Sequence, residues 1–393
     1  MKNKFFIIAP IAAVVAMFIF TLTLFPSVQP APKNLPIAIV NLDEGVEVPG
    51  QGAVNLGNTF AETIQTGMAQ GDEEPAVKWI EIESKEAVLK GLEEKEYYAA
   101  LVIPADFSLK QGSLRTPTPT NPELEIFINQ GMNVSAATIA TQALNGMVDN
   151  MNLTMRTQLL EGFAAQDMTL TTEQAAAIAT PIQKVVTNLN APGENTSGGN
   201  MPISLFQPLW IASLATAVLL FFAVSKNPVS TRRPAIMQRV MQVVMAIVAA
   251  CLVGFALPWL AEAMVGFNIP EYMPTAIFLT ITALAFMTMI LAVLSVIGFP
   301  GIAVFVLLLF FGAPLLALAP EMMPSFYQDW VYPWLPMRFM VEGLREIFFA
   351  GTGVTWANTQ VLIWIMIVSI VVILLSVFIP KKSKVDANLV AVK

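Results

Sequence analysis

The residue types that most often carry out catalysis are nearly absent from this chain of 393 residues. There is no histidine, and the single cysteine, Cys251, lies inside an apolar run. Histidine is the commonest general base and transition-metal ligand, and no Ser-His or Cys-His pair can form without it. No G-x-x-x-x-G-K-[ST] loop occurs, so the chain carries no P-loop ATPase of its own. We therefore expect no enzyme and no catalytic, cofactor-binding or metal site.

Clustered carboxylates are the remaining candidates for ligand chemistry. Asp43, Glu44 and Glu47 could hold calcium through oxygen ligands, but the EF-hand spacing is missing. A solvated acidic turn is therefore the favoured interpretation of this cluster.

The overall charge is low and unevenly distributed. Hydrophobic residues make up 55% of the chain and charged residues only 12%, about half the charged share of a soluble domain. Residues 26–204 contain 21 Asp and Glu but 9 Lys and Arg, which makes this segment strongly acidic. An acidic domain argues against a nucleic-acid partner, because phosphates need neutralising cations.

Six apolar runs without Asp, Glu, Lys or Arg have the length of about 17 to 25 residues that a helix needs to cross a bilayer. They are Phe5–Phe25, Leu205–Val224, Val240–Leu260, Thr275–Ile297, Ile302–Ala319 and Val361–Ile379. The first run exceeds the apolar core of about 7 to 15 residues in a signal peptide, which favours an uncleaved anchor. Since ion-driven transporters normally keep ionisable groups within their spans, ion-coupled pumping is not expected.

The basic residues of the short loops predict the orientation of these spans. Lys and Arg precede the first run, separate the second from the third and follow the sixth. These residues are Lys2, Lys4, Lys226, Arg232, Arg233, Arg239, Lys381, Lys382 and Lys384. We predict a multi-pass plasma-membrane protein with six spans in the lipid bilayer, both termini in the cytoplasm and the acidic segment outside the cell.

The sequence of the acidic segment predicts a small α/β domain. Short apolar runs predict strands at 37–40, 78–82, 98–103 and 124–128. Helical spacing predicts helices at 84–96, with Ser84 as N-cap, at 134–163 and at 172–189. The expected fold is thus a six-helix all-α membrane bundle with an extracellular α/β domain inserted between spans 1 and 2. Its parts are a first helix at 1–25, the external domain at 26–204, spans 2–6 at 205–380 and a cytoplasmic tail at 381–393.

An amphipathic helix is expected between the last two spans, near 337–350. Its apolar face is opposite a charged face on which Arg338 and Glu342 are spaced i,i+4. Two interpretations stand side by side. The helix lies on the outer leaflet, or it is re-entrant and enters the bundle, where Glu342 and Arg345 would pair.

Four segments together resemble the phage infection protein (YhgE/Pip) family within the ABC-2 type permease group. They are Leu35–Gly45 (LPIAIVNLDEG), Glu86–Ser108 (EAVLKGLEEKEYYAALVIPADFS), Asn129–Asn133 (NQGMN) and Leu335–Gly351 (LPMRFMVEGLREIFFAG). The resemblance implies a bacterial plasma-membrane protein. Relatives serve as phage receptors, as type VII secretion components or as ABC-2-like exporter subunits. ABC-2 permeases typically dimerise, with a second copy or a related membrane subunit, and rely on a separate ATPase.

The resemblance also marks nine motif residues of unknown role. They are Asn41, Asp43, Gly45, Pro104, Asp106, Phe107, Ser108, Asn129 and Asn133. Turn and cap chemistry is the favoured interpretation over ligand contact, with Asp106 or Ser108 capping a helix after a strand and Asn41 and Asp43 closing a loop.

Two functional hypotheses follow from these expectations. The first is a permease subunit that exports a hydrophobic or envelope-related substrate with an ATPase supplied in trans, contacted through Arg232, Arg233 and Arg239. The second is a cell-surface receptor or scaffold without transport activity, in which the external domain recognises a partner. The substrate or ligand is not encoded in any recognisable motif.

Overall fold

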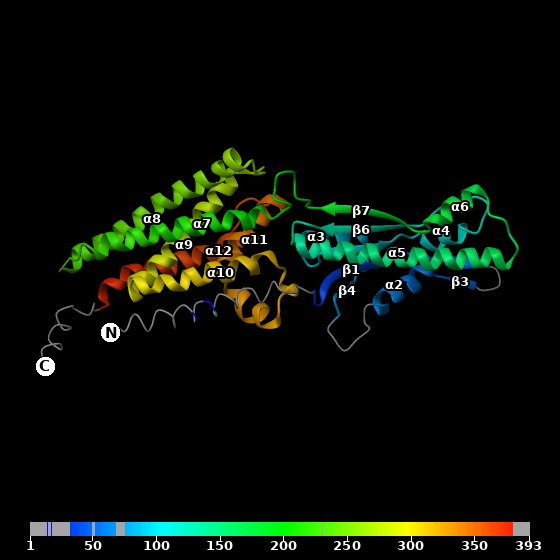
Figure 1. Cartoon of the computed structure of the whole chain (residues 1–393), viewed down its shortest axis with the longest axis horizontal. Coiled ribbons are helices and arrows are strands. Elements are labelled where there is room, and N and C mark those ends of the chain that lie inside the picture. Colours follow the sequence, from blue (N-terminus) through cyan, green and yellow to red (C-terminus); the bar gives the residue numbers. More distant parts are fainter. Residues whose placement is uncertain are drawn as a thin grey trace. The chain divides into compact units, whose positions relative to one another are not determined.

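The computed structural model describes residues 14, 17, 32–48, 52–67, 75–229 and 231–379. The chain divides into two compact units (Figure 1). The α/β unit comprises the described residues within 32–192 and 317–330, and the membrane unit comprises residues 14 and 17 and the described residues within 193–316 and 331–379. Except for Val14 and Met17, the predicted first span lies outside the described residues, as does the tail 381–393. A sixth span and the extracellular placement therefore stay predictions.

A five-stranded mixed sheet organises the α/β unit, in the order β4-β1-β5-β6-β7. The strands are β1 (Leu35–Asn41), β4 (Val77–Glu81), β5 (Ala99–Ile103), β6 (Glu123–Asn129) and β7 (Gln183–Leu189). Strand β1 runs parallel to both β4 and β5, β6 is antiparallel to β5, and β7 is parallel to β6. The four strands predicted from sequence are β1, β4, β5 and β6.

Helices and one hairpin complete this unit. They are the hairpin β2 (Val46–Val48) and β3 (Gly52–Val54), and the helices α2 (Leu56–Gly67), α3 (Lys85–Glu93), α4 (Phe107–Ser113), α5 (Val134–Ala165) and α6 (Thr172–Ala179). The predicted helix at 84–96 is confirmed as α3, and the Ser84 side chain accepts a hydrogen bond from the amide of Ala87 as expected of an N-cap.

The prediction of one helix over 172–189 is wrong in its second half. Helix α6 ends at Ala179, and residues 183–189 form strand β7 beside β6. Pro181 cannot continue a helix, and the β-branched run Val185, Val186 and Thr187 favours an extended backbone.

The core of the α/β unit lies on both faces of the central strands. All five residues of β5 are buried, as its continuous apolar sequence predicted. On one face, the side chains of α3 pack in a cluster with those of β1 and β5. On the other, Phe60 of α2 meets Phe107 of α4 edge to face, with ring centroids 5.4 Å apart. This arrangement directs the N-termini of α2 and α4 toward the carboxyl end of β1.

A segment from far along the chain also belongs to this unit. Residues 317–330 lie nearly 300 positions after the start of β1, yet the backbone carbonyl of Glu321 accepts a hydrogen bond from the amide of Lys33, at 2.9 Å. The hydroxyl of Tyr98 donates to the Glu321 carboxylate at 2.8 Å. Two bonds to one residue thus attach the segment to the start of β1 and to the residue before β5.

Five helices of the membrane unit are long and apolar enough to cross a membrane. They are α7 (Met201–Ser225), α8 (Arg232–Leu260) with its continuation to Val265, α9 (Tyr272–Ile297), α10 (Ile302–Ala317) preceded by a short turn from Phe299, and α12 (Trp356–Leu375) with its continuation to Phe378. They match the second to sixth predicted runs. Helix α9 is central, because 67% of its most apolar window is buried against no more than 28% in the other four.

The described membrane helices contain one buried charged residue that the predicted limits of the spans excluded. Helix α8 starts eight residues before the predicted run, so Arg232, Arg233 and Arg239 lie on a helix rather than in a loop. Arg239 is 4% exposed, and its guanidinium donates to Gln242 at 2.8 Å and to Ser295 of α9 at 3.2 Å. The expectation of a bundle without ionisable groups is therefore wrong, because these side-chain acceptors allow a charge to be buried there.

Candidate functional site

The motif residue Asp43 is at the centre of a buried cluster just beyond the end of β1. Its side chain is 7% exposed and accepts from three donors. The Oδ1 atom accepts from the Ser108 amide at 2.8 Å, while Oδ2 accepts from the Gly57 amide at 3.0 Å and from the Ser108 hydroxyl. Asp43 thus joins the end of β1 to the first turns of both α2 and α4.

The cluster continues through the residues that flank Asp43. The hydroxyl oxygen of Ser108 accepts from the Leu56 amide at 2.8 Å, and the side chain of Asn55 donates to the Asp43 carbonyl at 2.6 Å. Helix N-termini carry unpaired amides and partial positive charge, and they attract anions. Here the chain's own carboxylate occupies that position, so the chemistry of the cluster is capping.

Several other motif residues support the same turn. Gly45 has a left-handed backbone, with φ of 77°, which favours glycine. Asp106 stands at the N-cap of α4 but makes no cap hydrogen bond, and it pairs instead with Lys110 at 3.0 Å. The Pro104 carbonyl accepts from the Phe107 amide at 3.1 Å. Of the two predicted caps of α4, the Asp106 side chain makes no cap hydrogen bond, and the Ser108 hydroxyl accepts from the Leu56 amide of α2; the Ser108 amide of α4 donates to Asp43, which lies just beyond the end of β1.

The two remaining asparagines of the motif set lie at the opposite end of the sheet. Asn129 ends β6, is 1% exposed and donates to the Leu92 carbonyl at 2.6 Å. Asn133 is the N-cap of α5 and accepts from the Ala136 amide at 3.1 Å. Both side chains make structural hydrogen bonds, which supports the cap and turn interpretation and does not bring them near Asp43.

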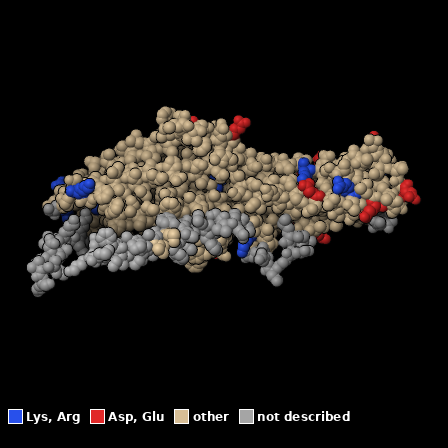
Figure 2. Space-filling view, in the orientation of Figure 1, with Lys and Arg blue, Asp and Glu red and all other residues tan. Residues whose placement is uncertain are grey.

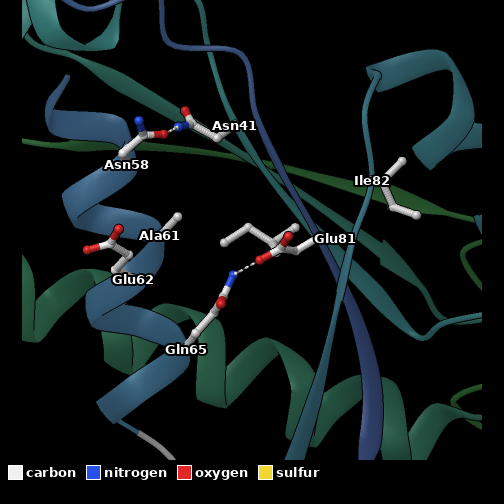
Figure 3. A pocket seen from close by; sticks show the side chains of 8 residues that line it. Asn41, Asn58, Ala61, Glu62, Gln65, Glu81 and Ile82 are labelled. Carbon is white, nitrogen blue, oxygen red and sulfur yellow. Dashed lines mark hydrogen bonds between the residues drawn. The ribbon is translucent and has the colours of Figure 1, made fainter.

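A polar cavity of about 290 Å³ lies between α2 and the edge of the sheet formed by β1 and β4 (Figure 3). Its polar lining consists of amides and carboxylates, with Asn41 and Asn58 hydrogen-bonded at 2.6 Å and Gln65 donating to Glu81 at 2.9 Å. Glu62 of α2 also lines the cavity, and in Figure 3 its carboxylate points away from Glu81. The lining suits a hydrogen-bonding or cationic group.

A second cavity of about 480 Å³ lies where the segment 317–330 meets the sheet. Its lining carries charges of both signs. The charged residues are Lys33, Lys78, Glu96, Glu321 and Asp329. Within the described parts of the chain, no group of three or more His, Cys, Asp or Glu could hold a metal ion.

In the membrane unit, the predicted amphipathic helix is α11 (Pro336–Arg345), followed by a wider turn to Ala350. It packs against α7, α9 and α12, and its apolar side chains are buried. Of the two interpretations left open by the sequence, this contact favours a helix inside the bundle.

The polar residues of α11 contact residues of the same helix and of neighbouring segments. Glu342 accepts from the Tyr332 hydroxyl at 3.1 Å and forms the predicted i,i+4 pair with Arg338 at 3.7 Å. Arg345 is 9% exposed and donates to the Leu316 carbonyl at 3.4 Å. The pairing of Glu342 with Arg345 stays a prediction. Burial of Tyr332, and next the negative charge of Glu342, raise the pKa of the tyrosine above its usual range, so the hydroxyl stays a donor.

Replacing Tyr332 with phenylalanine tests this cluster. Loss of the hydroxyl removes the hydrogen bond to Glu342, and we expect the free energy of unfolding to fall by about 0.5–1.5 kcal/mol. Thermal unfolding of the detergent-solubilised chain would measure the change. Glu342→Gln is the companion variant, because it keeps an acceptor for Tyr332 and removes the charge that pairs with Arg338. Equal unfolding temperatures of Tyr332→Phe and wild type would contradict a role for the hydroxyl.

The predicted partner-contact residues fall into two groups. Arg232 and Arg233 are exposed in the first turn of α8, at the end of the bundle where Figure 2 shows basic side chains. The Arg232 guanidinium stands 5.7 Å from the centre of the Phe378 ring. Arg239 is buried, as described above, so its side chain is not accessible to another protein. The candidate contact surface therefore narrows to two arginines.

Sequence reasoning missed the residues whose partners lie far away along the chain. Asn55 and Gly57 carry no signal by themselves, although Asn55 is the residue before a helix and accepts from the Asn58 amide like an N-cap. Tyr332 lies ten residues before Glu342 and outside the helical pattern that identified α11. Only the folded chain brings these residues to their partners.

Comparison with known proteins gives a family and two partial likenesses. Residues 6–378 match the family described as "Protein of unknown function (DUF3533)". Over 97 residues the chain is 37% identical to "Uncharacterized protein YhgE" of Bacillus subtilis (strain 168), which covers 24% of this chain and 12% of that protein. The resemblance to YhgE predicted from the sequence is confirmed over that stretch. The match spans about an eighth of the length of that relative.

One solved structure also shows a partial likeness. It is the "crystal structure of a domain of a putative ABC type-2 transporter from Thermotoga maritima MSB8", with 17% identity, a TM-score of 0.26 and coverage of 39% of this chain and 84% of that one. The family match, by contrast, extends over nearly the whole chain. The protein is a multi-pass membrane protein that belongs to the DUF3533 family.

Proposed function

We propose that the chain is an ABC-2-like permease subunit that exports a hydrophobic or envelope-related substrate, with an ATPase supplied in trans. The observation that carries this proposal is the position of α11, an amphipathic helix packed among α7, α9 and α12. The motif resemblance to the YhgE/Pip family within the ABC-2 type permease group points in the same direction. The subunit performs no chemistry of its own and would act with a second copy or a related membrane subunit.

The position of α11 favours a permease for an energetic reason. A protein that needs only an anchor can use apolar helices alone, because each polar or charged group placed at membrane depth costs free energy. Here Arg239 is buried between membrane helices, and Arg345 is buried on α11. Polar groups kept inside a bundle at such a cost mark a place where helices move or a substrate passes.

The energy source must come from another polypeptide, since the sequence contains no P-loop. The exposed arginines Arg232 and Arg233 are the proposed contact for it, at the basic end of the bundle. Basic loops face the cytoplasm in multi-pass proteins, where ATP is available. This orientation is part of the proposal: a cytoplasmic ATPase would reach the two arginines, and the α/β unit would lie outside the cell.

A charge reversal tests the contact. We expect an ATPase to co-purify with the wild-type chain in mild detergent and to be lost from the double variant Arg232→Glu, Arg233→Glu, because reversed charges repel a complementary surface. The expected loss of bound ATPase is at least about tenfold. Arg156→Glu is the matched control, since Arg156 is an exposed arginine of α5 in the α/β unit.

The same experiment separates the second hypothesis from the first. A receptor or scaffold needs no ATPase and would use the α/β unit to recognise its partner. If no ATPase accompanies the wild-type chain, or if the double variant retains it fully, the export proposal fails and the receptor proposal takes its place.

A further inference from the structure

The last strand of the sheet, β7, has an open edge. It pairs with β6 on one side, and among the described residues no strand pairs with its other side. The strand is seven residues long and largely exposed on both faces, with Val185 and Val186 each 43% exposed. Figure 1 shows β7 as the outermost arrow of the sheet. A row of unpaired amides and carbonyls along such an edge is a template for another strand.

The hydrogen bonds of β7 show which of its residues face this open edge. The Gln183 amide donates to the Pro122 carbonyl at 2.9 Å, and the Leu189 carbonyl accepts from the Gln130 amide at 3.2 Å. Both odd-numbered residues therefore direct their backbone groups toward β6. Since these groups alternate along a strand, the amides and carbonyls of Lys184, Val186 and Asn188 point outward.

The open edge lacks the features that normally prevent strand pairing. It contains no proline, and its only charged residue is Lys184, which forms an ion pair with Asp149 at 2.7 Å. The opposite edge of the sheet, β4, has exposed Lys78 and Glu81 along a five-residue strand. Exposed charges on short strands discourage strand pairing, so the β4 edge is protected against it and the β7 edge is not.

We propose that two copies of this chain associate through β7, antiparallel and in register about a two-fold axis at Val186. In this register Val186 faces Val186 of the second copy, and Lys184 faces Asn188. The three outward-facing residues of each strand would then form about six backbone hydrogen bonds. The pairing joins the two five-stranded sheets into one continuous sheet.

The strand complements a copy of itself better than an unrelated partner. The register sets no two like charges opposite each other, because Lys184 faces an amide and is neutralised by Asp149. The β-branched residues Val185, Val186 and Thr187 meet one another, which stabilises cross-strand pairs. The pairing is independent of whether the bundle exports anything.

Charged substitutions of Val186, which lies on the proposed two-fold axis, test the pairing. Two full-length variants with different tags, Val186→Lys and Val186→Glu, are produced in the same cells and purified through one tag. We expect the mixed pair to exceed each like-charged pair by at least about fivefold, since opposite charges attract across the axis and like charges repel. Because Val186 is exposed, both variants should fold, which thermal unfolding would verify.

The matched control places the same charges on Leu160, which is 42% exposed on α5 and away from the proposed axis. There, mixed and like-charged pairs should form in statistical proportion. Statistical proportions for the Val186 variants would overturn the proposal, even if the chains associate through the bundle. Co-purification of a different protein on β7, lost in both Val186 variants, would overturn it as well and assign the edge to that partner.

Discussion

Replacing Asp43 with alanine should lower the free energy of unfolding of the α/β unit by about 3–5 kcal/mol, because a buried carboxylate with three donors is lost. Each hydrogen bond to a charged acceptor contributes about 1.5–3 kcal/mol, and the contributions do not add fully. The amides of Gly57 and Ser108 would remain buried without an acceptor. We expect the first turns of α2 and α4 to open.

Hydrogen exchange of the full chain in detergent would locate this change. Amides in β1, α2 and α4 should lose protection, while those of the membrane helices should keep it. Asp43→Asn should behave nearly like alanine, because its amide group would place donors against the donors of Gly57 and Ser108.

The matched control is Asp106→Ala, two residues before Ser108. Its carboxylate stands at the N-cap of the same helix but makes no cap hydrogen bond, is 46% exposed and pairs only with Lys110. We expect a loss of at most about 1 kcal/mol, the usual contribution of a surface ion pair. If Asp43→Ala and Asp106→Ala lowered the free energy of unfolding equally, the hydrogen bonds of Asp43 to Gly57 and Ser108 would not be what stabilises the α/β unit.

The elements that could be predicted from the sequence are those with local causes. The membrane helices α7 to α10 and α12 follow from long apolar runs, α3 follows from helical spacing with Ser84 as N-cap, and α5 follows from helical spacing. Ser84 and Asn133 cap their helices through amides three residues away. Short-range interactions of this kind are visible in a linear chain.

The errors have causes that lie outside the local sequence. Residues 183–189 were assigned to a helix, but β6 supplies hydrogen bonds that an isolated segment lacks. Arg239 was excluded from a membrane helix, but Ser295 and Gln242 satisfy its guanidinium there. In both places tertiary contacts override the local preference.

The candidate site was predictable in its residue types and not in its connections. The motif resemblance singled out Asp43 and Ser108, and turn or cap chemistry was the favoured interpretation. That Asp43 would cap two helices at once depends on β1, α2 and α4 meeting at one point, which is a property of the sheet order. The same holds for the bond between Tyr98 and Glu321, which are 223 residues apart.

Replacing Gly254 with leucine should prevent α8 and α9 from packing, with an expected loss of at least about 3 kcal/mol. A Cβ atom at this position would lie 2.6 Å from the backbone nitrogen of Thr280 and 2.7 Å from its Cα. Backbone atoms cannot rotate away as a side chain can. Gly254 belongs to a buried row at spacing four on α8, and small residues in such rows let membrane helices approach closely. The row consists of Gln242, Ala246, Ala250, Gly254 and Pro258.

A matched pair of variants distinguishes this contact from a general intolerance of large residues. Ala256 is two residues along the same helix and exposed, so Ala256→Leu adds apolar volume where lipid can accept it and should leave stability nearly unchanged. Gly254→Ala should fall between wild type and Gly254→Leu, since even one methyl group meets the Thr280 backbone. Thermal aggregation of the three detergent-solubilised variants would rank them. If Gly254→Leu and Ala256→Leu aggregate at the same temperature, then α8 and α9 do not approach each other at Gly254, and the burial of Arg239 between these two helices loses its structural support.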